Sequence, residues 1–182
     1  MDLGHVGIHV RDFEAMLGFY QRVFGFVISD IKRGPERSIV FLTSEPEVHH
    51  QFVIANGRAA DDHSRVINQI SFRVSSLAEL KRIGSALRGE QIEDLDIITH
   101  GTAWSIYFRD PEGNRAEAFV DTPWYVDQPF RAPIDLDQPE DVLRRETEAL
   151  CRTQPGFQGI EQWRLKLAQR FEGAKAQASS AV

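Results

Sequence analysis

The first segment of the chain alternates apolar and polar side chains with the two-residue period of a β-strand. In residues 3–10, LGHVGIHV, valine and isoleucine fall on one side and histidine and glycine on the other. Apolar residues then recur at helical spacing over 13–24, with Asp12 as a predicted N-cap and Gly25 as the residue that ends the helix. Three β-rich runs follow, near 26–31, 38–43 and 49–55. This order predicts a βαβββ module.

The same order of elements returns in the second part of the chain. It predicts a strand, a helix and three further strands, over Val66–Val74, about Leu77–Leu87, and near 92–98, 103–109 and 115–121. An offset of 64 places residues 5–10 over residues 69–74, apolar on apolar and polar on polar. The repeat predicts two equivalent modules, about 3–57 and 65–121, each with a four-stranded sheet.

The composition changes after Asp121, and the prolines at 129, 133 and 139 disfavour a regular strand ladder. We expect an irregular arm, followed by two amphipathic helices over 138–152 and 159–171 and a frayed end after about residue 173. The predicted fold class is α+β, with one domain over 1–121 and a C-terminal extension over 122–182.

Charge and cysteine content exclude several classes of partner. The 182 residues carry 21 Lys plus Arg against 27 Asp plus Glu, a net charge of −6, which disfavours nucleic acid and anionic membranes as partners. The one cysteine, Cys151, cannot form an intrachain disulfide, and the first residues lack the pattern of a secretory signal. We therefore expect a cytoplasmic protein.

Three polar side chains from separate strands suggest a metal site. His5 lies on the polar side of the first strand, Gln69 holds the equivalent place in the repeat, and Glu117 lies in the last predicted strand. Two such donors and a carboxylate on one side of a divalent cation would leave positions open for substrate and for dioxygen or water. Taken one by one, the three also fit a hydrogen-bonded strand histidine, an interior amide and a rim carboxylate.

Two segments carry a resemblance to a known family. GHVGIHVRDFEAMLGFYQRVFGF (4–26) and YFRDPEGNRAEAF (107–119) resemble the opening unit and the closing hairpin of the vicinal oxygen chelate superfamily. That superfamily includes glyoxalase I, fosfomycin-resistance enzymes, extradiol ring-cleaving dioxygenases and bleomycin-binding proteins. The resemblance covers about residues 3–121 and implies paired modules that form a curved sheet around a cavity.

The resemblance also implies a ligand set. The family's metal ligands map onto His5, Gln69 and Glu117. Gln69 is a departure, because extradiol dioxygenases and fosfomycin-resistance enzymes have histidine there, whereas some glyoxalases use glutamine. A glutamine oxygen binds hard cations but is a weaker donor to iron than imidazole.

Two further features resemble the extradiol dioxygenases. His49-His50 opens the predicted fourth strand, as in the family's His-His strand, where one histidine transfers protons; we select His50. Tyr107 resembles the family's tyrosine that hydrogen-bonds a substrate oxygen, and His100 resembles its substrate-contacting histidine. An exposed histidine pair, a tyrosine packed on the sheet and a solvated loop histidine are the alternatives.

The resemblance thus favours an extradiol dioxygenase that binds a catechol-type diol on Fe(II) or Mn(II) and opens the ring with dioxygen. His50, His100 and Tyr107 would be catalytic, and a homodimer is expected. One alternative is a glyoxalase- or epimerase-like metalloenzyme that consumes no oxygen. The other is a metal-free protein that binds a small molecule, as bleomycin-binding relatives do.

Overall fold

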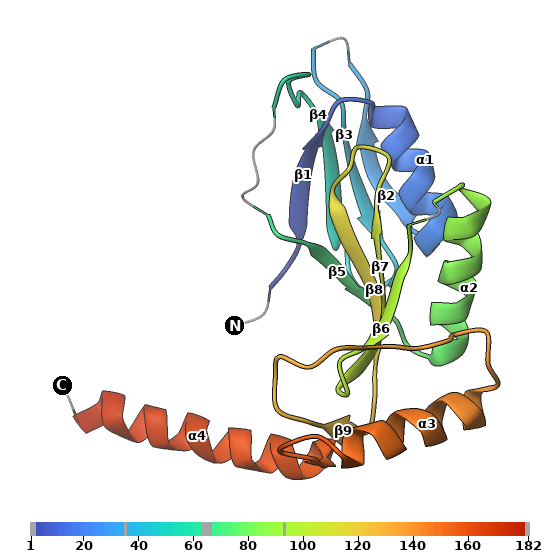
Figure 1. Cartoon of the computed structure of the whole chain (residues 1–182). Coiled ribbons are helices and arrows are strands. Elements are labelled where there is room, and N and C mark those ends of the chain that lie inside the picture. Colours follow the sequence, from blue (N-terminus) through green and yellow to red (C-terminus); the bar gives the residue numbers. More distant parts are fainter. Residues whose placement is uncertain (1–2, 35, 63–66, 93, 181–182) are drawn as a thin grey trace. The chain divides into compact units, whose positions relative to one another are not determined.

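A computed structural model of the chain describes residues 3–34, 36–62, 67–92 and 94–180, with side chains as far as Glu172 (Figure 1). Contacts between Cα atoms divide the chain into two compact units. Unit 1 consists of residues 1–71, 82–95 and 107–117, and unit 2 consists of residues 72–81, 96–106 and 118–182. In the part of the chain so described, no helix has both the length and the apolar character needed to cross a membrane.

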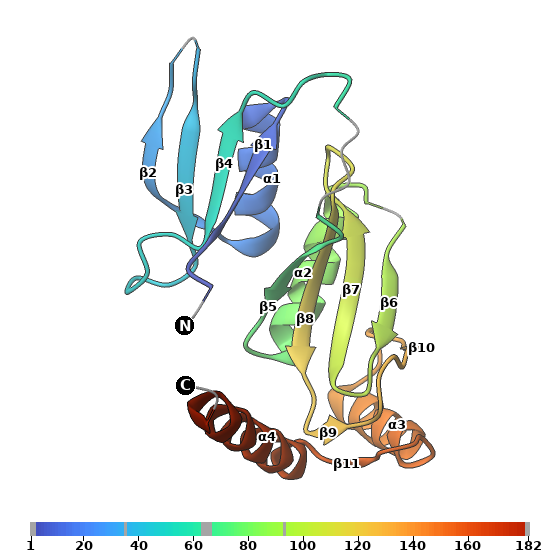
Figure 2. The ribbon, with the colours of Figure 1, turned by 90° about the vertical axis from the view of Figure 1, so that its left-hand side faces the viewer.

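The first module forms a four-stranded mixed sheet. Its elements are β1 (Val6–Val10), α1 (Phe13–Phe24), β2 (Val27–Lys32), β3 (Ile39–Thr43) and β4 (Phe52–Asn56). The strand order is β1-β4-β3-β2, with β1 parallel to β4 and the other pairs antiparallel. Figure 2 shows α1 on one face of this sheet. The predicted βαβββ order is confirmed.

The second module repeats this topology. It contains β5 (Ile70–Arg73), α2 (Leu77–Gly89), β6 (Asp96–Thr99), β7 (Ala103–Arg109) and β8 (Arg115–Asp121). The order β5-β8-β7-β6 matches β1-β4-β3-β2, and β10 (Ala132–Pro133) adds a fifth strand beside β6. The predicted fold class is therefore confirmed. Val66, the predicted start of the first strand, lies outside the described residues.

Local sequence signals define α1. The side chain of Asp12 accepts a hydrogen bond from the Ala15 N–H at 3.0 Å, and Gly25 ends the helix with a φ of 73°. Both residues act as predicted. The buried face of α1 packs on β4, where the rings of Tyr20 and Phe52 have centroids 4.7 Å apart. Both rings are fully buried and belong to the core of unit 1.

The C-terminal extension contains more strand pairing than predicted. The prolines predict an irregular arm without a regular strand ladder, yet Pro133 of β10 pairs with Ile98 of β6. In addition, β9 (Trp124–Tyr125) pairs with β11 (Gln158–Gly159). A proline lacks only the N–H donor, so the edge of a sheet tolerates it. The helices are α3 (Glu140–Arg152) and α4 (Ile160–Ser180).

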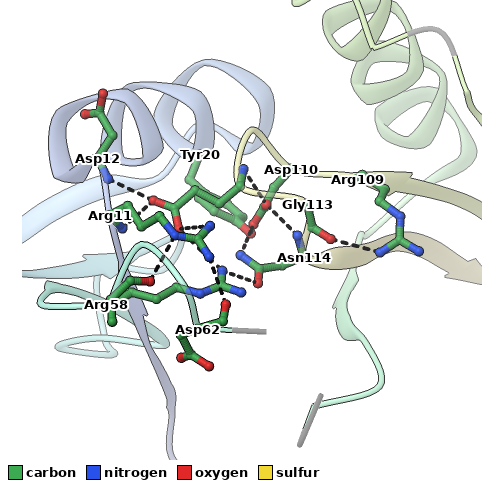
Figure 3. Close-up of polar contacts among 11 residues, drawn as sticks. Arg11, Asp12, Tyr20, Arg58, Asp62, Arg109, Asp110, Gly113 and Asn114 are labelled. Atoms are coloured by element: carbon green, nitrogen blue, oxygen red, sulfur yellow. Dashed lines mark hydrogen bonds and ion pairs between the residues drawn. The ribbon is translucent and has the colours of Figure 1, made fainter. Parts of the chain in front are cut away.

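A turn between β7 and β8 is attached to the start of α1. Asp110 is 3% exposed, and its carboxylate accepts hydrogen bonds from the Tyr20 hydroxyl at 3.0 Å and from the Asn114 amide at 2.8 Å (Figure 3). Burial raises the pKa of Asp110, while these hydrogen bonds oppose the rise. Gly113, with a φ of 81°, supplies the left-handed residue of the turn.

Glu112 in the same turn joins two segments that are far apart in sequence. Its Oε1 accepts hydrogen bonds from the backbone N–H groups of Arg11 and Asp12, and its Oε2 lies 3.4 Å from Nη1 of Arg58. The Glu112 side chain is 7% exposed. A buried carboxylate that satisfies two backbone donors and a guanidinium has a structural role.

We predict that Glu112→Ala lowers the free energy of unfolding by about 2–4 kcal/mol, because two N–H groups and Arg58 lose their acceptor. Denaturant unfolding measures the change. Glu14→Ala is the control, since Glu14 forms an exposed ion pair with Arg33 and should cost less than about 1 kcal/mol. Equal losses in the two variants would contradict this role for Glu112.

Candidate functional site

A buried carboxylate in β8 is the centre of the candidate site. Glu117 is 6% exposed, and its Oε2 accepts hydrogen bonds from Nε2 of Gln69 at 3.0 Å and from Oγ of Ser71 at 2.6 Å. Gln69 and Ser71 are two residues apart at the start of β5, so their side chains fall on the same face of the strand that neighbours β8. Strand alternation thus directs both donors to Glu117.

Tyr107 in β7, the strand on the other side of β8, is the third donor to this carboxylate. Burial, together with the hydrogen bond and the negative charge of Glu117, raises the pKa of Tyr107 to about 12. A hydrogen bond from Gln69 and the positive charge of Arg115, whose guanidinium carbon lies 4.5 Å from the centre of the Tyr107 ring, act in the opposite direction. Tyr107 therefore keeps its proton at neutral pH.

His5 and His50 form a second cluster in unit 1. Their ring centroids are 4.3 Å apart, and Nδ1 of His50 lies 2.8 Å from Nδ1 of His49. Nε2 of His49 lies 2.9 Å from a carboxylate oxygen of Asp30. Because a carboxylate only accepts, His49 donates from Nε2, and in its neutral form it accepts from Nδ1–H of His50.

This arrangement makes His50 a proton acceptor at Nε2. Partial desolvation lowers the pKa of His50, and the positive charges that His5 and His49 carry when protonated lower it further. His50 lies two residues before β4 rather than within it, since β4 begins at Phe52. A neutral imidazole with one free nitrogen can accept a proton from a ligand.

The predicted metal ligands fall into these two clusters. Gln69 and Glu117 are in direct contact, whereas the ring contact of His5 is with His50. Among the described residues, no group of three or more His, Cys, Asp or Glu side chains is placed to hold a metal ion. The predicted set contains only two residues of these types, so the oxygen of Gln69 would have to complete it. The donor set suits a hard divalent cation, and the ligand assignment stays a prediction.

His100, the third predicted catalytic residue, lies in the loop before β7. Its Nδ1 donates to the backbone oxygen of Phe130 at 2.8 Å, and its own backbone oxygen accepts from Nε2 of Gln128 at 2.8 Å. Both partners belong to the C-terminal arm. The hydrogen bond to Phe130 orients the ring, and the one from Gln128 holds the backbone of His100. A contact of His100 with substrate stays a prediction.

A small cavity of ≈ 240 Å³ lies beside β1 in unit 1. Gly7, Ile8 and His9 form one wall, and Arg58, Asp62, Ile67 and Asn114 complete it. Nδ1 of His9 donates to the backbone oxygen of Asn56 at 3.0 Å, which leaves Nε2 of the neutral ring as an acceptor. The lining of this cavity therefore includes a histidine and an arginine, and Nη1 of Arg58 donates to Glu112 and Asn114.

Sequence reasoning missed Ser71 and Arg115. A signal for Ser71 was present, because it shares the polar side of residues 69–74 with Gln69. Arg115 carried no signal, since its position over the Tyr107 ring depends on the pairing of neighbouring strands.

Several solved structures have a similar fold. The glyoxylase/bleomycin resistance protein/dioxygenase domain from Frankia sp. EAN1pec is 20% identical, with a TM-score of 0.56 over 67% of this chain and 93% of that one. The fosfomycin resistance protein FosX from Mesorhizobium loti is 22% identical, with a TM-score of 0.52 over 66% and 92%. FosX from Listeria monocytogenes, in complex with Mn(II) and sulfate, is 19% identical, with a TM-score of 0.52 over 66% and 93%.

At these identities the similarity shows the fold alone, and no curated protein gave a significant match. The family comparison goes further, because residues 2–118, most of the chain, match one family. These residues contain the first module, the second module as far as residue 118 in β8, and all six of the predicted site residues. The chain belongs to the Glyoxalase/Bleomycin resistance protein/Dioxygenase superfamily.

Proposed function

We propose that the protein is a metal-dependent enzyme of the glyoxalase or epimerase kind, acting on a small molecule that offers two neighbouring oxygens to a divalent cation. The observation that supports this proposal is the state of Glu117. Its carboxylate is almost fully buried, and Gln69, Ser71 and Tyr107, which hydrogen-bond to it, are all uncharged. A buried carboxylate with neutral partners is stabilised by a bound cation.

We assign the cation to His5, Gln69 and Glu117. An imidazole, an amide oxygen and a carboxylate suit Mn(II) or a similar hard cation better than they suit iron chemistry, for which a second imidazole is the stronger donor. The Mn(II) complex of the Listeria FosX supports the choice of cation. A bound divalent cation would supply Lewis-acid stabilisation of negative charge on the substrate oxygens.

The chain's own residues would bind the substrate and move protons. Tyr107 is protonated at neutral pH and can donate a hydrogen bond to a substrate oxygen. His50 is held neutral, with its Nε2 as acceptor, and can take a proton from the substrate and return it. His100, fixed by its hydrogen bond to the arm, would orient the substrate.

A ring-cleaving dioxygenase acting on catechol-type diols is the second candidate. The neutral His50 and the protonated Tyr107 favour it, because the first can take a proton from a diol and the second can donate a hydrogen bond to a substrate oxygen. Dioxygen uptake separates the two candidates, since the glyoxalase or epimerase kind consumes none. The third outcome is a metal-free protein that binds a small molecule.

The proposal includes a homodimer in the cytoplasm with small molecules as its partners. The net charge of −6 disfavours nucleic acid as a partner, the free, buried Cys151 is in keeping with a reducing compartment, and the homodimer rests on the resemblance to the family. Burial raises the pKa of this thiol to about 11, with a contribution from the charge of Glu148, so the thiol is a poor nucleophile.

We predict that the purified protein binds Mn(II) and that His5→Ala and Glu117→Ala each weaken binding by at least about tenfold, because each removes a ligand. Mn(II) titration followed by calorimetry and by metal analysis measures the affinity. His9→Ala is the matched control, since it removes an exposed histidine in β1, four residues after His5. Unchanged binding in the two ligand variants would refute the assignment, and no binding in any form would favour the metal-free alternative.

We predict that Gln69→His raises the affinity for Fe(II) relative to Mn(II), because it replaces an amide oxygen by imidazole. Competition between the two cations under anaerobic conditions measures the ratio. A panel of catechols tested in an oxygen electrode should then give no uptake with the wild-type protein loaded with either cation. Uptake that depends on both protein and catechol would establish the dioxygenase candidate instead.

We predict that a tyrosine titrating near pH 12 is present in the wild-type protein and absent from Tyr107→Phe, as measured by absorbance at 295 nm. The folded protein holds this proton more tightly than the unfolded chain does, in which tyrosine has a pKa of about 10. The contribution of Tyr107 to stability is therefore complete below about pH 10 and is lost as the pH rises towards 12.

The difference in unfolding free energy between wild type and Tyr107→Phe, measured below about pH 10 and again as the pH approaches 12, should shrink as the pH rises. Tyr125→Phe is the control, because Tyr125 stacks on Trp163 in unit 2. Loss of the same titration in both variants would contradict this assignment, and so would a titration near pH 12 that remains in Tyr107→Phe. Either result would mean that the high pKa does not belong to the Tyr107 hydroxyl.

A further inference from the structure

A second cavity, of ≈ 330 Å³, lies in unit 2 and outside the residues that match the family. Residues 133–135 of the arm form one side, and Leu143, Glu146, Thr147 and Leu150 of α3 form the other. The four α3 residues follow the spacing i, i+3, i+4 and i+7, so they share one face of the helix. The cavity thus lies between one helix face and a segment of the arm.

Both sides of this cavity are held in place. On the helix side, the buried Thr147 accepts a hydrogen bond from the indole N–H of Trp104 at 2.9 Å, and Trp104 is itself fully buried. On the arm side, β10 pairs with β6 through Ala132 and Pro133, and Nζ of Lys81 donates to the backbone oxygen of Gln138. Side-chain and backbone hydrogen bonds therefore hold both walls of the cavity in the folded structure.

The lining combines apolar walls with two carboxylates. Leu150 on the helix and Ile134 on the arm, both half-buried, supply the accessible apolar surface, and the buried Leu143 completes the lining. Asp135 and Glu146 come from opposite sides and are both exposed, which places two negative charges at the rim. Oδ1 of Asp135 also accepts a hydrogen bond from the backbone N–H of Asp137 at 2.9 Å, which orients that carboxylate.

The neighbouring cations are engaged elsewhere or face another direction. Arg131 forms an ion pair with Asp96 at 2.6 Å, and Arg144 forms one with Glu140 at 2.6 Å while its guanidinium lies over the Trp104 ring. Arg145 follows directly on the helix and is therefore rotated by about 100° from the direction of Glu146. On the arm side, Lys81 donates to the backbone oxygen of Gln138, and the charged residues that line the cavity itself are Asp135 and Glu146, both acidic.

We propose that this cavity binds a small organic cation, an ammonium group carried on an apolar body. The apolar walls would take the body, and Asp135 and Glu146 would attract the ammonium group from two sides. The volume falls at the lower end of the range of small-molecule sites, about 300–1,000 Å³, so the body should be no larger than one or two rings. This site goes beyond the proposed enzymatic function, and either can fail without the other.

Three probes with the same apolar body test the proposal. Phenethylamine, 2-phenylethanol and phenylacetate carry a positive, a neutral and a negative group, and each is titrated into the full-length protein at low salt. NMR of the indole N–H groups localises binding, because the Trp104 N–H points at the cavity residue Thr147. We expect the amine to bind more tightly than the alcohol, the carboxylate to bind least, and the Trp104 signal to shift.

Four variants separate charge from shape. Asp135→Asn and Glu146→Gln should each weaken binding of the amine by about threefold to fivefold, the strength of one exposed ion pair, and leave the alcohol unchanged. Glu172→Gln, the same change of charge elsewhere in unit 2, should have no effect. Leu150→Trp should fill the cavity and abolish binding of both probes.

Four results would overturn the proposal. The first three are equal affinity for the three probes, an amine affinity that survives both carboxylate substitutions, and binding that leaves the Trp104 signal in place. The fourth is a dimer that dissociates in Leu150→Trp, seen by sedimentation, which would assign the cavity to contact with a second copy of the chain.

Discussion

The burial of the Glu117 carboxylate is the constraint on which the candidate site depends. A carboxylate removed from water must be compensated, and here Gln69, Ser71 and Tyr107 provide the hydrogen bonds. These donors come from the two strands on either side of β8, so the pairing β5-β8-β7 is what assembles the site. Burial, together with the hydrogen bond and the charge of Glu117, raises the pKa of Tyr107 and keeps it a donor. The geometry of the site and the protonation state of Tyr107 therefore have one origin.

Two glutamates of the closing hairpin, five residues apart, have opposite uses. Glu112 joins the turn to the start of α1 and forms an ion pair with Arg58, which neutralises its charge within the folded structure. Among the described residues, the hydrogen-bond partners of Glu117 are uncharged, so none of them neutralises its charge. Burial alone does not separate the two side chains, because both are almost fully enclosed. The two side chains differ in the charge of their partners, because Glu112 pairs with the guanidinium of Arg58, whereas Gln69 and Ser71 beside Glu117 are uncharged.

Much of the fold could be predicted, because its signals are local or repeated. The alternation in residues 3–10, the cap at Asp12 and the stop at Gly25 each involve neighbours in the sequence. The 64-residue repeat predicted two modules, and the strand order of the second sheet repeats that of the first. The pairing of Pro133 with Ile98 could not be predicted, because it depends on where the arm meets the edge of the sheet.

The sequence by itself determined which residue types were available for chemistry and on which side of each strand they fall, since alternation follows from backbone geometry. It placed Gln69 and Glu117 as candidates but did not reveal that Ser71 and Tyr107 share that carboxylate, nor that His5 packs on His50. Only the tertiary structure decided these contacts. They join residues up to 48 positions apart, and such contacts depend on strand pairing and burial, which no local pattern encodes.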